Sequence, residues 1–224
     1  MNCDPIARWY RWLEYIGFGR ELERRRIAFL GDISDARKIL VLGEGDGRFL
    51  VRLFEQTIQK PMKERPMSEW PGVEIHYVDL SLRMLELARK RLEAAGHTGD
   101  AITFQQANAL TILLPRAQYD LIVTHFFLDC FNEAEAAKLV QNISDAALPH
   151  ARWLISEFRQ SEVGWRAAWA WLWLRLLYLF FRVTTGLETT RLIDHHGLLL
   201  RTGFRLSRAE TARFGLLVSE LWVR

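Results

Sequence analysis

The chain has 224 residues, of which 50% are hydrophobic and 25% charged, and its formal net charge is +3. This length suffices for one well-buried domain, so we expect a single domain over residues 1–224. Lys and Arg are dispersed along the chain, which argues against a nucleic-acid partner. The two cysteines, Cys3 and Cys130, support neither a disulfide framework nor a cysteine-rich metal site. Because no secretory signal pattern is present, we expect a cytoplasmic protein.

The first predicted elements are helical. Residues 5–30 repeat apolar side chains at helical spacing, and the pair Gly17 and Gly19 divides them into two short helices. A strand is predicted at 38–42, followed by a helix over about 47–59. The expected buried face of that helix consists of Phe49, Leu50, Leu53 and Phe54.

Three alternating glycines, Gly43, Gly45 and Gly47, connect this strand to this helix. Glycine lets the backbone turn tightly and lets a ligand approach where a Cβ would collide. A dinucleotide fingerprint starting at Gly43 would need glycine at position 48, where the chain has Arg48, and no phosphate-binding P-loop motif occurs. The pattern predicts a cofactor at the end of the strand; the alternative is a tight strand–helix turn without a ligand.

The middle of the chain alternates strands and helices. Residues 59–72 contain three prolines and a glycine, which predicts a loop. A strand at 73–80 is followed by an amphipathic helix at 81–96, which has Ser81 near its start and Gly96 at its end. Further strands are predicted at 101–110, 119–127 and 151–158, and a further helix at 132–148.

Residues 165–183 form a Trp-rich apolar helix, and 203–224 form an antiparallel hairpin in this interpretation. Arg166, Arg175 and Arg182 interrupt the apolar helix, and a mid-membrane Arg costs ~2.5–3.5 kcal/mol, so a bilayer span is not expected. Being apolar around most of its circumference, the helix must bury more than one face. The surfaces that could cover these faces are the sheet, the N-terminal aromatic helix, a second subunit in a homodimer, or lipid headgroups in peripheral membrane contact.

The glycine turn, the strand–helix alternation and the final hairpin together resemble the class I S-adenosylmethionine (SAM)-dependent methyltransferases. The resemblance implies an α/β, Rossmann-like fold. Its sheet has seven strands and is mostly parallel with an antiparallel C-terminal strand, and helices cover both faces. It also implies SAM as cofactor, bound beyond the carboxyl ends of the strands.

The resemblance also implies roles for particular residues. Gly43, Glu44, Gly45 and Gly47 would face the methionine end of SAM, and Asp79 would accept hydrogen bonds from the ribose hydroxyls, or serve only as a helix N-cap. The acidic residue expected two positions before the first glycine is replaced by Val41; Glu44 takes over part of its role or is an exposed loop carboxylate. The adenine contacts are expected at Leu80, Met84, Asn108 and Ala109.

The expected catalytic residues are His125 and Asp129, which follow the fourth strand. The pKa of histidine suits proton removal near neutral pH, although His125 is equally expected as a packing or SAM-contacting residue. His195 and His196 lack the accompanying ligands that a metal site requires, so no metal is expected. They are assigned to a helix surface unless they border the acceptor pocket.

The resulting hypothesis is SAM-dependent methyl transfer to a small hydrophobic or lipid-like acceptor. Residues 1–30 would form an N-terminal helical lid, with Tyr10 and Tyr15 as lid contacts to the ligands, and residues 160–200 an apolar helical insertion or lid. One alternative is aminopropyl transfer, as in spermidine synthases. Another is a catalytically silent protein of the same fold that serves as an interaction module.

Overall fold

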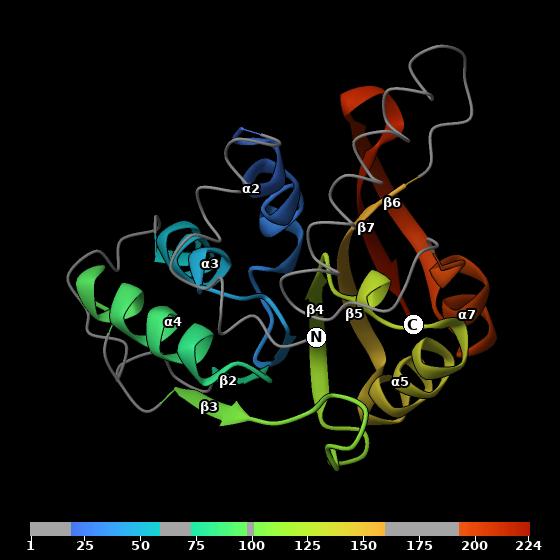
Figure 1. Cartoon of the computed structure of the whole chain (residues 1–224), viewed down its shortest axis with the longest axis horizontal. Helices are drawn as coiled ribbons and strands as arrows, with labels where there is room; N and C mark the ends of the chain where they lie inside the picture. Colours follow the sequence, from blue (N-terminus) through green and yellow to red (C-terminus); the bar gives the residue numbers. More distant parts are fainter. Residues whose placement is uncertain (1–18, 59–72, 98–100, 160–192) are drawn as a thin grey trace.

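A computed structural model of the protein describes residues 19–58, 73–97, 101–159 and 193–224. Its centre is a seven-stranded sheet with the order β3-β2-β1-β4-β5-β7-β6 (Figure 1). The strands are β1 (Lys38–Leu42), β2 (Glu74–Asp79), β3 (Ile102–Gln106), β4 (Tyr119–His125), β5 (Ala147–Phe158), β6 (Arg205–Ala212) and β7 (Leu217–Val223). The first five strands run parallel, and β7 pairs antiparallel with both β5 and β6. The predicted sheet with its antiparallel C-terminal strand is confirmed.

Helices cover both faces of the sheet (Figure 1). One face carries α2 (Glu21–Arg26), α3 (Arg48–Ile58) and α4 (Leu82–Ala94), and the other carries α5 (Glu133–Ala146) and α7 (His195–Arg201). Short 3-10 turns complete the described part: η1 (Leu30–Ile33), η3 (Leu128–Cys130) and η4 (Arg213–Gly215). In the described ranges, no helix combines the length and the apolar character needed to cross a bilayer.

Strand β1 shows how the sequence divides the core into two layers. Because side chains alternate along a strand, Ile39 and Val41 pack with α3 and α4, whereas Leu40 and Leu42 pack with α5 and α7. All four are almost fully buried, as expected of a central parallel strand covered by helices on both faces. Val41, which replaces the acidic residue of the resemblance, is therefore a core residue.

Two helices begin directly after residues whose side chains cap them. Ser81 caps α4 by accepting a hydrogen bond from the Met84 N–H at 3.1 Å, and Asn132 and Glu135 form a complete capping box at the start of α5. The predicted helices at 47–59 and 81–96 are found at 48–58 and 82–94. Such local signals explain why these elements could be predicted from sequence.

Two predicted strand boundaries differ from the structure by four residues. The third strand ends at Gln106 instead of 110, because Asn108 starts a turn in which its Oδ1 accepts a hydrogen bond from the Leu110 N–H at 3.0 Å. Strand β5 begins at Ala147 rather than 151, since Ala147 pairs with Tyr119 ahead of a register shift. The expected Trp-rich helix at 165–183 and residues 1–18 lie outside the described residues.

Candidate active site

A cavity lies at the carboxyl ends of the strands, where the strand order reverses between β1 and β4. It holds about 690 Å³ of empty space, including its open mouth. Turns following β1, β2, β3 and β4 supply its walls. The lining residues are Gly43, Gly45, Val78, Asp79, Leu80, Met84, Ala107, Asn108, Ala109, Phe126, Phe127, Cys130 and Phe131.

Backbone hydrogen bonds hold these turns together. The Gly43 N–H donates to the Val78 carbonyl at 2.9 Å, and the Ala107 N–H donates to the Asp79 carbonyl at 3.1 Å. The glycine turn, the end of β2 and the turn after β3 are thus fixed relative to one another. Residues 28 and 35 positions apart in the sequence are thus brought together around one cavity.

The glycines of this turn serve two purposes. Gly43 has φ +60°, and a Cβ at this position would collide with the ring of Phe127, which closes over the turn. Gly47 has φ +79°, and a Cβ there would lie 2.7 Å from the Cα of Ala88 in α4. Gly43 therefore keeps backbone at the cavity wall, whereas Gly47 permits α3 to approach α4 closely.

Glu44 turns into the protein and does not line the cavity. Its carboxyl group accepts hydrogen bonds from the Gly47 and Phe49 N–H groups at 3.1 and 3.2 Å and from the Tyr77 hydroxyl at 2.9 Å. Burial raises the pKa of Glu44 to about 7, although the nearby Arg26 guanidinium opposes this increase. The alternative of an exposed loop carboxylate is wrong, because the side chain is buried and holds the start of α3.

Asp79 is half-buried at the cavity wall, where its Oδ1 accepts a hydrogen bond from the Ser81 N–H at 2.8 Å. This bond fixes the carboxylate, while Ser81 rather than Asp79 caps α4. Leu80 and the buried Met84 line the cavity beside it. Asn108 is exposed at the far wall, and its carbonyl oxygen retains a second lone pair besides the one used by Leu110.

His125 lies behind the cavity wall. It is 2% exposed, its Nδ1 lies 3.0 Å from Ser156 Oγ, and its ring packs edge-on against Phe49. Burial, together with the charge of Arg26, holds the pKa of His125 well below its ordinary value. This environment favours the packing alternative over a role as a base.

The turn after β4 is strained. Phe126 has φ +53°, a left-handed conformation that is costly for a bulky residue, and its N–H donates to the Ser156 carbonyl at 2.6 Å. The turn directs the aromatic side chains of Phe126, Phe127 and Phe131 to the cavity. Sequence reasoning did not single out these residues, although the run of aromatics after a strand end was visible.

Behind this aromatic wall lie two buried carboxyl groups, Asp129 and Glu157, close enough to affect each other's protonation. Glu157 Oε1 also accepts hydrogen bonds from the N–H groups of Phe127 and Leu128, at 3.1 and 2.8 Å. Burial raises the pKa of Asp129 to about 6, and burial together with the Asp129 charge raises that of Glu157 well above its usual range. Both carboxyl groups therefore retain their protons to a higher pH than an exposed carboxyl group does. Glu157 was missed, although it lies at the carboxyl end of a predicted strand.

Tyr10 and Tyr15 lie outside the described residues. Of the remaining cofactor-binding predictions, seven lie together at the cavity and two do not. Those at the cavity are Gly43, Gly45, Asp79, Leu80, Met84, Asn108 and Ala109, while Glu44 and Gly47 lie behind it.

A seven-stranded sheet of this order, with an antiparallel β7 and a glycine-walled cavity at the switch point, defines the class I SAM-dependent methyltransferase fold. A family model described as "Methyltransferase domain" matches residues 40–152, about half of the chain. The chain belongs to this family. Methyl transfer is the reaction that the family's description names, and solved structures of the same fold contain bound SAM or SAH.

Relatives and solved structures agree with this assignment. The demethylmenaquinone methyltransferase of Thermus thermophilus is 27% identical over 150 residues, which are 66% of this chain and 60% of that protein. The magnesium protoporphyrin IX methyltransferase of Synechocystis PCC 6803, solved with bound SAH, has a TM-score of 0.62 and 16% identity over 93% of this chain and 84% of its own. The mitomycin 7-O-methyltransferase MmcR has a TM-score of 0.66 and 15% identity. The match covers 98% of this chain and 59% of the MmcR chain.

Proposed function

We propose that the protein transfers the methyl group of SAM to a small, hydrophobic or lipid-like acceptor. The observation that carries this proposal is a cavity whose lining combines the glycine turn and Asp79 with a group of phenylalanines. Its backbone groups and carboxylate can bind a nucleoside, and its aromatic residues offer an apolar surface to an acceptor. The names of the relatives refer to demethylmenaquinone, magnesium protoporphyrin IX and mitomycin, which supports a small-molecule acceptor.

The residues at the nucleoside end fit SAM. Gly43 and Gly45 contribute backbone to the cavity wall, with the Phe127 ring lying against Gly43, and they are proposed to face the methionine end of SAM. The fixed Asp79 carboxylate can accept two hydrogen bonds from a ribose, and Leu80 and Met84 offer apolar contacts to a purine. Asn108 and the Ala109 N–H are proposed to recognise the adenine edge.

When bound, SAM supplies a methyl group on a positively charged sulfur, which a nucleophile can attack directly. The chain's contribution is then alignment and exclusion of water, which the aromatic wall of Phe126, Phe127 and Phe131 provides. For a hydroxyl acceptor, Asp129 is proposed as the base because its pKa of about 6 suits proton removal near neutral pH; its carboxyl lies behind the phenylalanines, so the acceptor must reach past them to it. For an amine acceptor, burial that keeps the amine neutral suffices.

Calorimetric titration with SAH tests the nucleoside site. Asp79→Asn keeps an oxygen for the Ser81 N–H but removes the charge, so losing hydrogen bonds to a charged group, worth ~1.5–3 kcal/mol, should weaken SAH binding by about 10- to 150-fold. Glu86→Gln removes an exposed carboxylate from the adjacent α4 and is the matched control. Unchanged affinity in Asp79→Asn would refute the assignment, and absence of SAH binding by the folded wild-type protein would favour a catalytically silent protein.

A further inference from the structure

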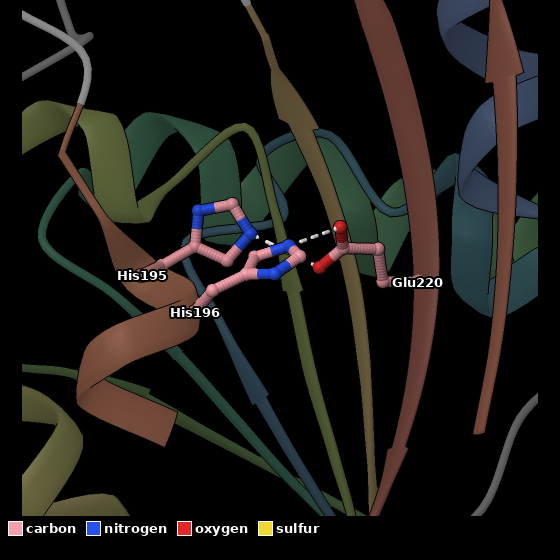
Figure 2. A group of neighbouring side chains, drawn as sticks. All are labelled: His195, His196 and Glu220. Carbon is pink, nitrogen blue, oxygen red and sulfur yellow. Dashed lines mark hydrogen bonds and ion pairs between the residues drawn. The ribbon is translucent and has the colours of Figure 1, made fainter. Parts of the chain in front are cut away.

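Three side chains that the proposed reaction does not use converge between the start of α7 and the middle of β7 (Figure 2). His195 Nε2 lies 3.0 Å from Glu220 Oε2, and His196 Nε2 lies 2.6 Å from Glu220 Oε1. The three candidate donor atoms lie within 4.8 Å of one another. The expectation that the two histidines lack a further ligand is therefore wrong: β7 brings Glu220 to them, and His195 is buried.

Neighbouring groups orient Glu220 and His196 and fix the start of the helix that carries both histidines. The Trp222 indole N–H donates to Glu220 Oε2 at 2.8 Å, and the His196 ring packs edge-on against the Trp222 ring at 4.9 Å between centroids. Asp194 caps α7 by accepting a hydrogen bond from the Gly197 N–H, which fixes the helix start that carries both histidines. A donor set held by such outer contacts loses little conformational entropy when it binds an ion.

The chemistry of this set is that of a transition-metal ligand set. Two imidazoles and one carboxylate bind Zn²⁺ at ~2.0–2.2 Å, which in tetrahedral geometry separates the donor atoms by about 3.3 Å. The present nitrogen–oxygen separations of 3.0 and 2.6 Å, each to a different Glu220 oxygen, differ from that value by less than 1 Å. The donor atoms as a group lie within 4.8 Å of one another, so the widest pair must move closer when an ion binds.

We propose that His195, His196 and Glu220 bind a divalent transition-metal ion, for which Zn²⁺ is the probe. Three protein ligands leave the fourth position of a tetrahedral ion open. The side chain of His196 is 39% exposed, so the ion and a fourth ligand can reach the site from solvent. The ion links α7 to β7, two elements of the chain's C-terminal part.

Untagged, chelator-treated protein is titrated with ZnCl₂ alone by calorimetry. Wild-type protein should bind one ion per chain with micromolar or tighter affinity, and His196→Ala should weaken binding at least about 100-fold, since it removes a ligand. His150→Ala, which removes an exposed histidine of β5, is the matched control and should bind like wild type. X-ray absorption at the zinc edge should show two imidazole nitrogens and a carboxylate oxygen.

Glu220→Gln is a second test variant. It removes the charged ligand, while its amide oxygen can still accept the hydrogen bond from the Trp222 indole N–H. If Glu220→Gln does not fold, the zinc titration of His196→Ala, a change at a half-exposed residue, tests the metal site. No binding by wild-type protein, or wild-type binding by His196→Ala, would overturn the proposal. SAH titration of the same His196→Ala sample should give wild-type affinity, so loss of the metal site is separable from loss of the cofactor site.

Discussion

The buried Glu44 makes a specific prediction about how stability depends on pH. Its folded-state pKa is raised from 4.5 to about 7, first by burial, so the folded protein holds this proton more tightly than the unfolded chain does. The stabilisation is present in full below pH 4.5 and is lost as the pH rises through 7. The raised pKa corresponds to a loss of about 3 kcal/mol of unfolding free energy over this window.

Glu44→Gln removes the titration while retaining an amide oxygen for one of the N–H donors. Urea unfolding, followed by tryptophan fluorescence at pH 5 to 8, gives the unfolding free energy of both proteins. The wild-type value minus the variant value should fall by roughly 2–3 kcal/mol between pH 5 and 8, since part of the effect is already lost at pH 5. Glu86→Gln, an exposed position on α4, is the control and should follow the wild-type profile. Parallel curves for wild type and Glu44→Gln would refute the assigned environment of Glu44.

Three further predictions concern other residues of the site and its support. Gly47→Ala should lower the unfolding free energy by at least ~1–2 kcal/mol in urea titrations, because its φ is +79° and the new Cβ meets Ala88. Ser81→Ala removes the cap of α4 and should cost ~1 kcal/mol, visible as a lowered Tm. Asp129→Asn should lower kcat for a hydroxyl acceptor ~10²-fold or more while SAH affinity stays unchanged; an unaltered kcat would exclude Asp129 as the base.

Much of the fold could be predicted because its signals are local. The glycine turn, the cap at Ser81 and the strand at 74–79 each depend on residues close in sequence. The cavity also followed from the rule that ligands bind at the carboxyl ends of parallel strands near the switch point. Gly43 and Asp79 therefore meet where the sequence predicted, because the Gly43 N–H bonds to the residue before Asp79.

The direction of individual side chains could not be predicted in the same way. Glu44 stands between two glycines and was expected near the cofactor, yet the N–H groups at the start of α3 and the Tyr77 hydroxyl attract its carboxyl inward. His125 has the residue type of a base, but its place at the end of a buried strand turns it toward Phe49 and Ser156. The residue type and its place in the sequence do not determine whether a side chain points to the cavity or into the core. Packing against neighbouring elements decides between the two.

The His195–His196–Glu220 cluster illustrates a further limit, set by topology. Glu220 lies 24 residues after His196, in a strand that inserts antiparallel between β5 and β6. Alternation along β7 places Glu220 and Trp222 on one face, and this face is the one that α7 covers, as the contacts of both residues with His196 indicate. A shift of one residue in the register of β7 would direct Glu220 to the opposite face and leave both histidines without their carboxylate. The pairing of β7 with β5 and β6 therefore determines whether the three donors meet.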